Sequence, residues 1–184
     1  SRLQQLAPKM PLFIEENYTA SLRGKLSRGE LDAIFVALPF TETDVVTRTL
    51  YDEPFVVLLP ENHVLAGQTQ IDSSALASHR VLLMGEGHCF RDQVLEACPG
   101  LHQAIRENYA RGDVVVEGSS LETLKHMVAS GLGITVLPQS AAREATYGQH
   151  TLAVRPVADA TLKRRISLAW RANDSRAEGI DILL

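Results

Sequence analysis

Short apolar runs alternate with helix-like stretches along most of this 184-residue chain. The run 31–38 is mostly apolar and is stopped by Pro39, which predicts a strand buried on both faces, as the strands of parallel sheets are. An alternation of strands and helices predicts an α/β fold. The other predicted strands cover residues 55–59, 81–84, 114–116, 134–137, 151–154 and 166–170.

The helix-like stretches carry start and stop signals. Thr19 is a candidate N-cap, and Gly29 is a candidate terminator of the helix that follows. Pro99 and Gly100 are expected to stop a later helix in the same way. The predicted helices cover residues 21–28, 73–77 and 90–98. Ser119 and Glu122 have the spacing of a capping box, which predicts the start of a further helix with Leu121, Leu124 and Val128 on its apolar face.

Length and charge restrict the class of protein. The chain is long enough for one large domain or two small lobes. Its net charge of −4 disfavours binding to the phosphate backbone of a nucleic acid, because such binding needs clustered Lys and Arg. Its apolar runs fall far short of the roughly 20 residues that a membrane span needs, and its first residues lack the pattern of a secretion signal. We therefore expect a cytoplasmic protein that binds neither membranes nor, by itself, DNA.

In a reducing cytoplasm, the two cysteines need a specific explanation, because cytosolic disulfides tend to be catalytic or redox-sensing. Cys89 follows two glycines at a predicted helix start and lies between His88 and Arg91. A helix N-terminus and neighbouring cationic groups both favour the thiolate form of a cysteine, which is the form that attacks peroxide. Oxidation would give a sulfenic acid that a second thiol can capture.

Cys98 has different surroundings from Cys89. It shares an i, i+4, i+8 stripe with Phe90 and Val94, which predicts that it is buried in the core and inert. Nine residues of helix would separate the two α-carbons by roughly 13 Å, whereas a disulfide needs them within about 7 Å. A disulfide between the two cysteines would therefore require the segment 90–100 to unwind or refold.

Other interpretations of the cysteines remain open. They could be unrelated buried thiols that act as small hydrophobic residues. A metal site could use His88, Cys89, Cys98 and His102, although the tight spacing of structural zinc sites is missing. A thiol peroxidase would use the same chemistry, but no C-x-x-C motif is present. The chain also lacks the G-x-S-x-G, P-loop and G-x-G-x-x-G motifs, so we expect no cofactor and no conventional enzyme.

Several motifs resemble the effector-binding domains of LysR-type transcriptional regulators over nearly the whole chain. They are Gly29-Glu-Leu-Asp32 before a strand, His63 after a Pro-x-x stretch, and Val128-Ala-Ser-Gly-Leu-Gly-Ile134 ending in Leu137-Pro138. The resemblance implies two Rossmann-like lobes joined by crossover strands, as in periplasmic binding proteins. Lobe I is expected over residues 1–52 and 168–184, and lobe II, with both cysteines, over residues 53–167.

A narrower resemblance is to the peroxide-sensing members of this family. It rests on Gly87-His-Cys-Phe-Arg-Asp-Gln93, on Cys98 nine positions after Cys89, and on Ser120-Leu-Glu-Thr-Leu124. It implies that Cys89 is the peroxidatic cysteine and Cys98 the resolving one. The implied peroxide pocket consists of Thr19, His88, Arg91, Asp92 and Arg171.

The same resemblance implies a set of partners. Hydrogen peroxide is the signal, other subunits form a dimer or tetramer, and glutaredoxin or thioredoxin restores the thiols. A winged helix-turn-helix, which these residues do not contain, would bring promoter DNA and RNA polymerase to the full-length protein. One departure is that the stretch 99–118 is longer than in the peroxide sensors, next to the segment that must refold.

An alternative within the family is a domain that binds a small organic effector between its lobes. Thr19 and Ser120 would then contact a carboxylate, and the cysteines would be incidental. The bulky and charged residues 88–91 argue against this alternative, because they lie where such a ligand would enter.

Overall fold

The computed structural model describes residues 5, 8, 10, 12–111, 116–142, 146–147, 150–159, 161–173 and 179–180. The chain divides into two compact units: unit 1 is Ser1–Asp52 with Arg165–Leu184, and unit 2 is Glu53–Arg164. The chain thus returns to unit 1 at Arg165 rather than at the expected residue 168, because its pairing with unit 1 begins at Ile166. Among the described residues, no helix is long and apolar enough to cross a membrane.

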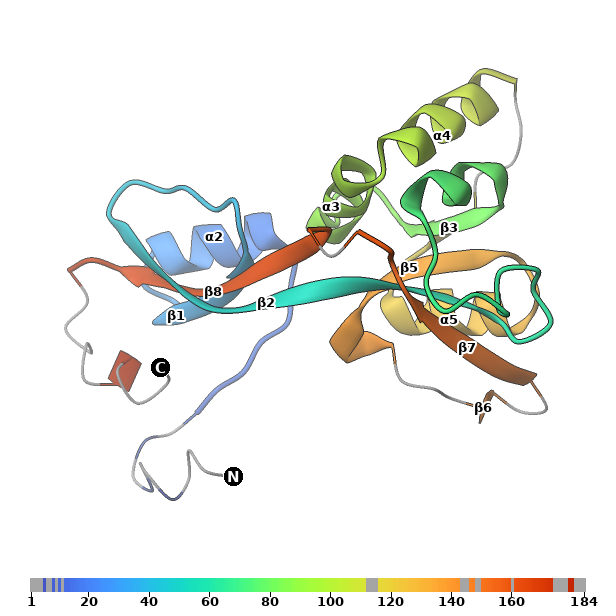
Figure 1. The fold of residues 1–184 in the computed structure, drawn as a ribbon. Helices are drawn as coiled ribbons and strands as arrows, with labels where there is room; N and C mark the ends of the chain where they lie inside the picture. The colour runs from blue at the N-terminus through green and yellow to red at the C-terminus, as the bar shows by residue number, and fades with distance from the viewer. Residues whose placement is uncertain are drawn as a thin grey trace. The chain divides into compact units, whose positions relative to one another are not determined.

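Unit 1 combines one helix with strands from both ends of the chain (Figure 1). Within it, β8 lies between β1 and β2. Its buried residues include Leu26 from the helix, Ile34 and Val36 from β1, and Ala169 from β8. The elements are α2 (Thr19–Ser27), β1 (Ala33–Ala37), the first part of β2 (Val45–Pro60) and β8 (Lys163–Arg171).

Two predictions for unit 1 are wrong in detail. Strand β1 pairs antiparallel with β8, and Phe35 is 60% exposed between the buried Ile34 and Val36, so β1 is not buried on both faces. An antiparallel strand can leave one face in water, which makes alternate residues point outward. The N-cap of α2 is Tyr18, and Thr19 is the first helical residue.

The predicted end of α2 is confirmed. Gly29 has a φ of 76°, a left-handed conformation that glycine adopts without steric cost. Its N–H donates to Leu26 O at 3.1 Å, and the N–H of Glu30 donates to Lys25 O at 2.9 Å. These two bonds form a Schellman motif, which satisfies carbonyls at the end of the helix.

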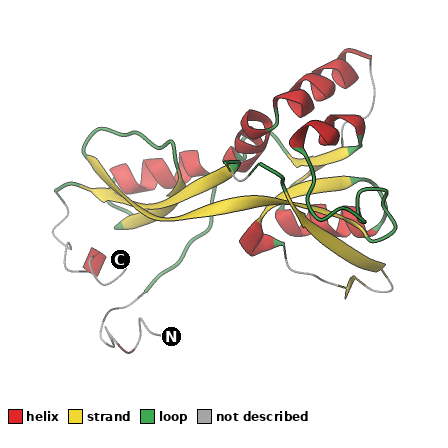
Figure 2. Ribbon diagram, in the orientation of Figure 1, coloured by secondary structure: helices red, strands yellow, loops and turns green. Residues whose placement is uncertain are grey.

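Unit 2 is built on a mixed sheet in the order β7-β2-β5-β3-β4. Strand β2 is antiparallel to both β7 and β5, whereas β3 is parallel to β5 and β4. Figure 2 shows its helices around these strands. The further elements are η1 (Ser73–Ser78), β3 (Val81–Met84), α3 (Cys89–Ala97), α4 (Pro99–Arg111), β4 (Glu117–Gly118), α5 (Leu121–Ala129), β5 (Ile134–Pro138), η2 (Gln139–Ala141), β6 (Thr146–Tyr147) and β7 (His150–Pro156).

The central strands of unit 2 are buried as predicted. All four residues of β3 and all five of β5 are buried, because helices and loops cover both faces of the sheet. Of the predicted strand 114–116, residues 114 and 115 lie outside the described residues, and the strand nearest to it is β4. The N-cap of α5 is Ser120, which accepts the N–H of Thr123. The cap thus lies one residue later than the predicted Ser119, and Thr123 rather than Glu122 takes the third helical position.

Pro99 and Gly100 start one helix as well as ending another. They end α3 as predicted, but Pro99 is also the first residue of α4. Proline is suited to this position, because its fixed φ is helical and a first-turn N–H has no intrahelical partner. The long stretch after Cys98 is therefore largely a helix, and it packs beside η1 (Figure 1).

Candidate functional site

Cys89 is the first residue of α3, as predicted for a reactive thiol. The turn that leads to it follows β3 and contains Gly87, whose φ of 88° is in the left-handed region. His88 is the N-cap and has an extended backbone. Cys89 itself is exposed and forms no disulfide, so a small oxidant can reach its sulfur atom.

The apolar face of α3 fixes the helix on unit 2. Phe90 and Val94 are buried in the core, and the Phe90 ring lies edge-on to Phe55 with 5.7 Å between the ring centroids. The guanidinium of Arg164 lies over the Phe90 ring at 5.4 Å from its centroid. Since Phe90 follows Cys89 directly, these contacts hold the first turn of the helix in place.

Arg91 points into the protein and is only 7% exposed. Its Nη1 donates to Met84 O, at the end of β3, at 2.9 Å and to Oε1 of Glu117, at the start of β4, at 2.5 Å. Sequence reasoning missed Glu117, because it lies 26 positions from Arg91 and no motif links them. Only the parallel pairing of β3 with β4 brings this carboxylate to the helix.

Cys98 is buried as predicted and is 2% exposed. Burial raises the pKa of its thiol to about 11, so it is protonated at neutral pH. It also joins two helices: it is the C-cap of α3, and its carbonyl accepts the N–H groups of Leu101 at 3.0 Å and His102 at 3.2 Å in α4. Cys98 therefore belongs both to the core and to the backbone of the helix junction.

The two thiols cannot bond while α3 is intact. The helix runs from Cys89 to Ala97, and Cys98 follows it directly. At about 1.5 Å per residue, this helix separates the two α-carbons by roughly 13 Å, well beyond the reach of a disulfide. A Cys89–Cys98 disulfide would require α3 to unwind and Cys98 to leave the core.

The remaining predicted pocket residues belong to different units. His88, half-buried, and Asp92, exposed in the first turn of α3, lie in unit 2 with the cysteines. Thr19 and Arg171 lie in unit 1. Arg171 donates through Nη1 to Leu26 O at 2.5 Å and to Leu31 O at 2.7 Å. The membership of all four residues in a peroxide pocket stays a prediction.

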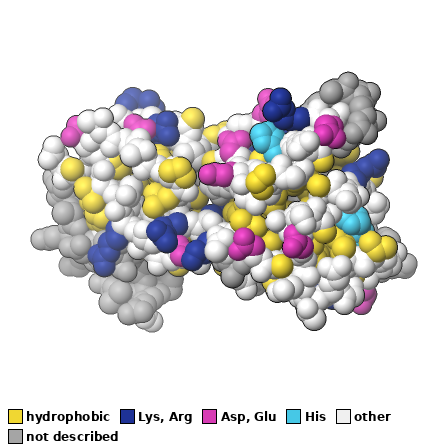
Figure 3. All heavy atoms as spheres, turned by 45° about the horizontal axis from the view of Figure 1, so that its top comes forward, with side chains coloured by type: hydrophobic (Ala, Val, Ile, Leu, Met, Phe, Trp, Pro, Cys, Tyr) yellow, Lys and Arg dark blue, Asp and Glu magenta, His cyan; other side chains and the backbone are white. Residues whose placement is uncertain are grey.

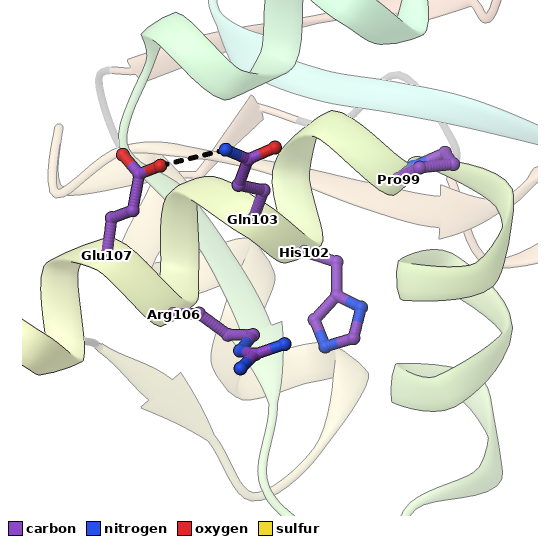
Figure 4. A pocket seen from close by; sticks show the side chains of 5 residues that line it. All are labelled: Pro99, His102, Gln103, Arg106 and Glu107. Carbon is purple, nitrogen blue, oxygen red and sulfur yellow. Dashed lines mark hydrogen bonds between the residues drawn. The ribbon is translucent and has the colours of Figure 1, made fainter.

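A hollow of about 530 Å³ lies along α4 and is separate from Cys89. Figure 4 shows Gln103 bonded to Glu107 along the helix, with His102 and Arg106 pointing to another side. All five residues that line the hollow belong to α4: Pro99, His102, Gln103, Arg106 and Glu107. Within the described ranges, no group of three or more His, Cys, Asp and Glu side chains could hold a metal ion.

The drawn surface carries basic and acidic side chains interspersed with one another. Figure 3 shows lysines and arginines next to acidic residues in both units. Ion pairs among the described residues include Arg28 with Glu30 and Arg165 with Asp52.

The fold and the arrangement of its elements place the chain in a known class. It belongs to the LysR substrate binding domain family, whose model matches residues 1–183. The predicted α/β fold of a LysR effector-binding domain is thereby confirmed.

Two solved structures of OxyR are similar to this chain in both sequence and fold. The chain is 50% identical to the reduced form of the OxyR regulatory domain from Pseudomonas aeruginosa, with a TM-score of 0.85 over 99% of this chain and 84% of that one. It is 41% identical to a reduced form of OxyR from N. meningitidis, with a TM-score of 0.88 over 98% and 82% of the two chains.

A curated relative is also named for a response to hydrogen peroxide. It is a probable hydrogen peroxide-inducible genes activator from Streptomyces viridosporus, 38% identical over 171 residues, which are 92% of this chain and 53% of the relative. The chain spans about half the length of this relative and of two similar proteins from mycobacteria.

Proposed function

We propose that this chain is the peroxide-sensing regulatory domain of a LysR-type transcriptional regulator of the OxyR kind. One observation carries the proposal: an exposed thiol begins α3, and a buried thiol follows the end of the same helix. The similarity to OxyR regulatory domains and to peroxide-inducible activators supports it.

The chemistry takes place in two steps. The Cys89 thiolate attacks one oxygen of hydrogen peroxide, the O–O bond breaks, and the products are a sulfenic acid and, after protonation, water. The Cys98 sulfur then attacks the sulfenic sulfur, and a second water leaves as the disulfide forms. Each peroxide thus oxidises two thiols to one disulfide, and a thiol reductant such as thioredoxin or glutaredoxin reverses the reaction.

The different surroundings of the two thiols set this order. Peroxide meets Cys89 first, because Cys98 is buried and protonated. Cys98 becomes a nucleophile only when the α3–α4 junction opens and exposes it to water. Peroxide chemistry is in this way coupled to refolding of the segment between the cysteines.

We propose supporting roles for the other predicted residues. Thr19 and His88 would hold peroxide, Arg91 and Asp92 would support the reduced pocket through polar contacts, and Arg171 would be a further pocket residue. Refolding would change how subunits assemble as a dimer or tetramer, and the full-length protein would pass the change to promoter DNA and RNA polymerase in the cytoplasm. We place the domain among sensors rather than among turnover enzymes.

The test is free-thiol titration with mass mapping after one equivalent of hydrogen peroxide. The expected result is a rapid loss of both thiols into a Cys89–Cys98 disulfide in the wild type. Cys89→Ser should keep Cys98 reduced, and Cys98→Ser should stop at the sulfenic acid on Cys89. Survival of both thiols in the wild type would refute the redox mechanism and leave the small-organic-effector alternative.

A further inference from the structure

Glu117 is placed next to the turn that leads to Cys89. It begins β4, where it is opposite Leu83 in the parallel pairing with β3, and its carboxylate forms the ion pair with Arg91. The Arg91 side chain is 8% exposed and that of Glu117 is 27% exposed. A buried guanidinium needs a compensating charge and satisfied N–H groups, so this carboxylate is part of what keeps Arg91 inside.

Three chain segments are joined at this point. Arg91 connects the first turn of α3 to the end of β3 through Met84 O and to the start of β4 through Glu117. A backbone bond from Gly85 N to Gly118 O, at 3.0 Å, connects the turn after β3 to β4 as well. The N–H of Arg91 also donates to the carbonyl of His88, the N-cap that precedes Cys89. The position of the Cys89 sulfur therefore depends on where Arg91 is anchored.

We propose that Glu117 is a positioning residue for Cys89: it holds Arg91, and through Arg91 it fixes the first turn of α3 at which the reactive thiol stands. This role rests on the proposed peroxide chemistry of Cys89. The carboxylate itself need not touch peroxide, because its effect passes through the guanidinium and the helix. A loss of this anchor lets the first turn shift, and small displacements of a reacting group have large effects on rate.

The test compares Glu117→Gln with Thr135→Val, both in a Cys98→Ser background in which the sulfenic acid persists. Thr135 is a matched control, because its buried hydroxyl donates to Leu82 O of the same strand β3 at 2.8 Å. Two rates are measured for Cys89: sulfenic acid formation with hydrogen peroxide, trapped by dimedone, and alkylation by iodoacetamide across a range of pH. Denaturant unfolding verifies that each variant is folded.

The expected result is a selective loss in Glu117→Gln. Its peroxide rate should fall by between about tenfold and a hundredfold, and its alkylation by iodoacetamide should also slow as the thiol leaves its place at the helix N-terminus. Thr135→Val should keep both at the wild-type level. Because Glu117 acts through Arg91, adding Glu117→Gln to Arg91→Lys should slow Cys89 little further, which is the non-additivity expected for coupled residues.

Several outcomes would overturn this role. They are unchanged rates in Glu117→Gln, an equal loss in Thr135→Val, or additive losses in the cycle with Arg91. Faster alkylation in Glu117→Gln would also overturn it, since it would mean that Glu117 acts by its charge on the thiol. If the glutamine variant does not fold, Glu117→Asp replaces it in the same cycle with the same criteria.

The two proposals fail in different ways. A wild-type protein that forms no sulfenic acid with peroxide would refute the proposed function. The alkylation measurements would still decide whether Glu117 positions Cys89, because iodoacetamide needs only an exposed thiol.

Discussion

Cys89 and Cys98 stand at the two ends of α3, the first exposed at its start and the second buried directly after its last residue. The same helix therefore keeps the thiols apart and presents only one of them to an oxidant. The bond between them can form only at the expense of the helix, since nine helical residues span roughly 13 Å.

Oxidation should raise hydrogen exchange at the backbone amides of the Cys89–Cys98 segment. The Val94 O···H–N Cys98 bond of 2.9 Å and the α3 bonds before it cannot survive the approach of the two sulfur atoms. Mass-spectrometric hydrogen exchange of the reduced and disulfide forms tests this. Helix α5 is an internal control that should keep its protection, and equal protection of α3 in both forms would contradict the prediction.

Leu101→Ala should speed closure of the disulfide once Cys89 is oxidised. Leu101 is 2% exposed in α4 and belongs to the same buried core cluster as Cys98, so packing of its side chain helps to hold the α3–α4 junction in the core. The variant should lower the free energy of unfolding by about 2–5 kcal/mol, as large-to-small core changes do. Stopped-flow measurement of sulfenic acid decay gives the rate of closure.

A comparison with Leu124→Ala makes that prediction specific. Leu124 is equally buried in the same core, but it lies in α5, away from the segment that must refold. Leu124→Ala should destabilise the domain similarly and leave the closure rate near that of the wild type. Equal acceleration in both variants would mean that overall stability, rather than the α4 anchor, controls closure.

The free energy of unfolding should fall between about pH 9 and pH 11 because of Cys98. Burial raises the pKa of its thiol from 9.0 to about 11, so in this range the unfolded chain releases the proton and the folded one keeps it. The unfolded state is therefore favoured as pH rises, by at most about 3 kcal/mol. Denaturant titrations at a series of pH values give the free energy of unfolding of the wild type and of Cys98→Ala. Plotted against pH, this free energy should fall more steeply in the wild type between about pH 9 and pH 11, and parallel plots would contradict the prediction.

His63 should make the domain less stable in mild acid. Its pKa is lowered, first by burial and then by the nearby His79, whose ring centroid lies 4.9 Å away. Its Nδ1 also accepts the N–H of Leu65 at 3.2 Å, which requires an unprotonated nitrogen. A lowered folded-state pKa means that the unfolded state binds the proton first, so stability is lost as pH falls below about 6.5.

His63→Gln is the variant that tests this effect. Glutamine retains an acceptor for the Leu65 N–H but carries no titrating ring. Thermal unfolding followed from pH 7.5 down to pH 5 should show a flatter decline in this variant than in the wild type. His79→Gln should give an intermediate slope, because it removes only the second cause of the lowered pKa. A steeper decline in His63→Gln would show that the sign is wrong.

Local signals were enough to predict much of the fold. The helix that begins at Cys89 was predicted to within one residue, because two glycines and a stripe of Phe90, Val94 and Cys98 mark it in sequence. The strands β3 and β5 are apolar throughout and were recognised from that alone. By contrast, β1 was predicted to be buried on both faces, because its composition does not reveal that its partner β8 is antiparallel.

The sequence by itself determined the placement of the two cysteines: one at a glycine-preceded helix start, the other on the apolar face one helix length away. These properties depend on neighbours along the chain, and short-range geometry fixes them. Only the tertiary structure decided that Glu117 anchors Arg91 and that α4 holds Cys98 in the core. Those contacts form only when the strands pair and the helices pack. They join residues that are far apart in sequence, so no local sequence pattern predicts them.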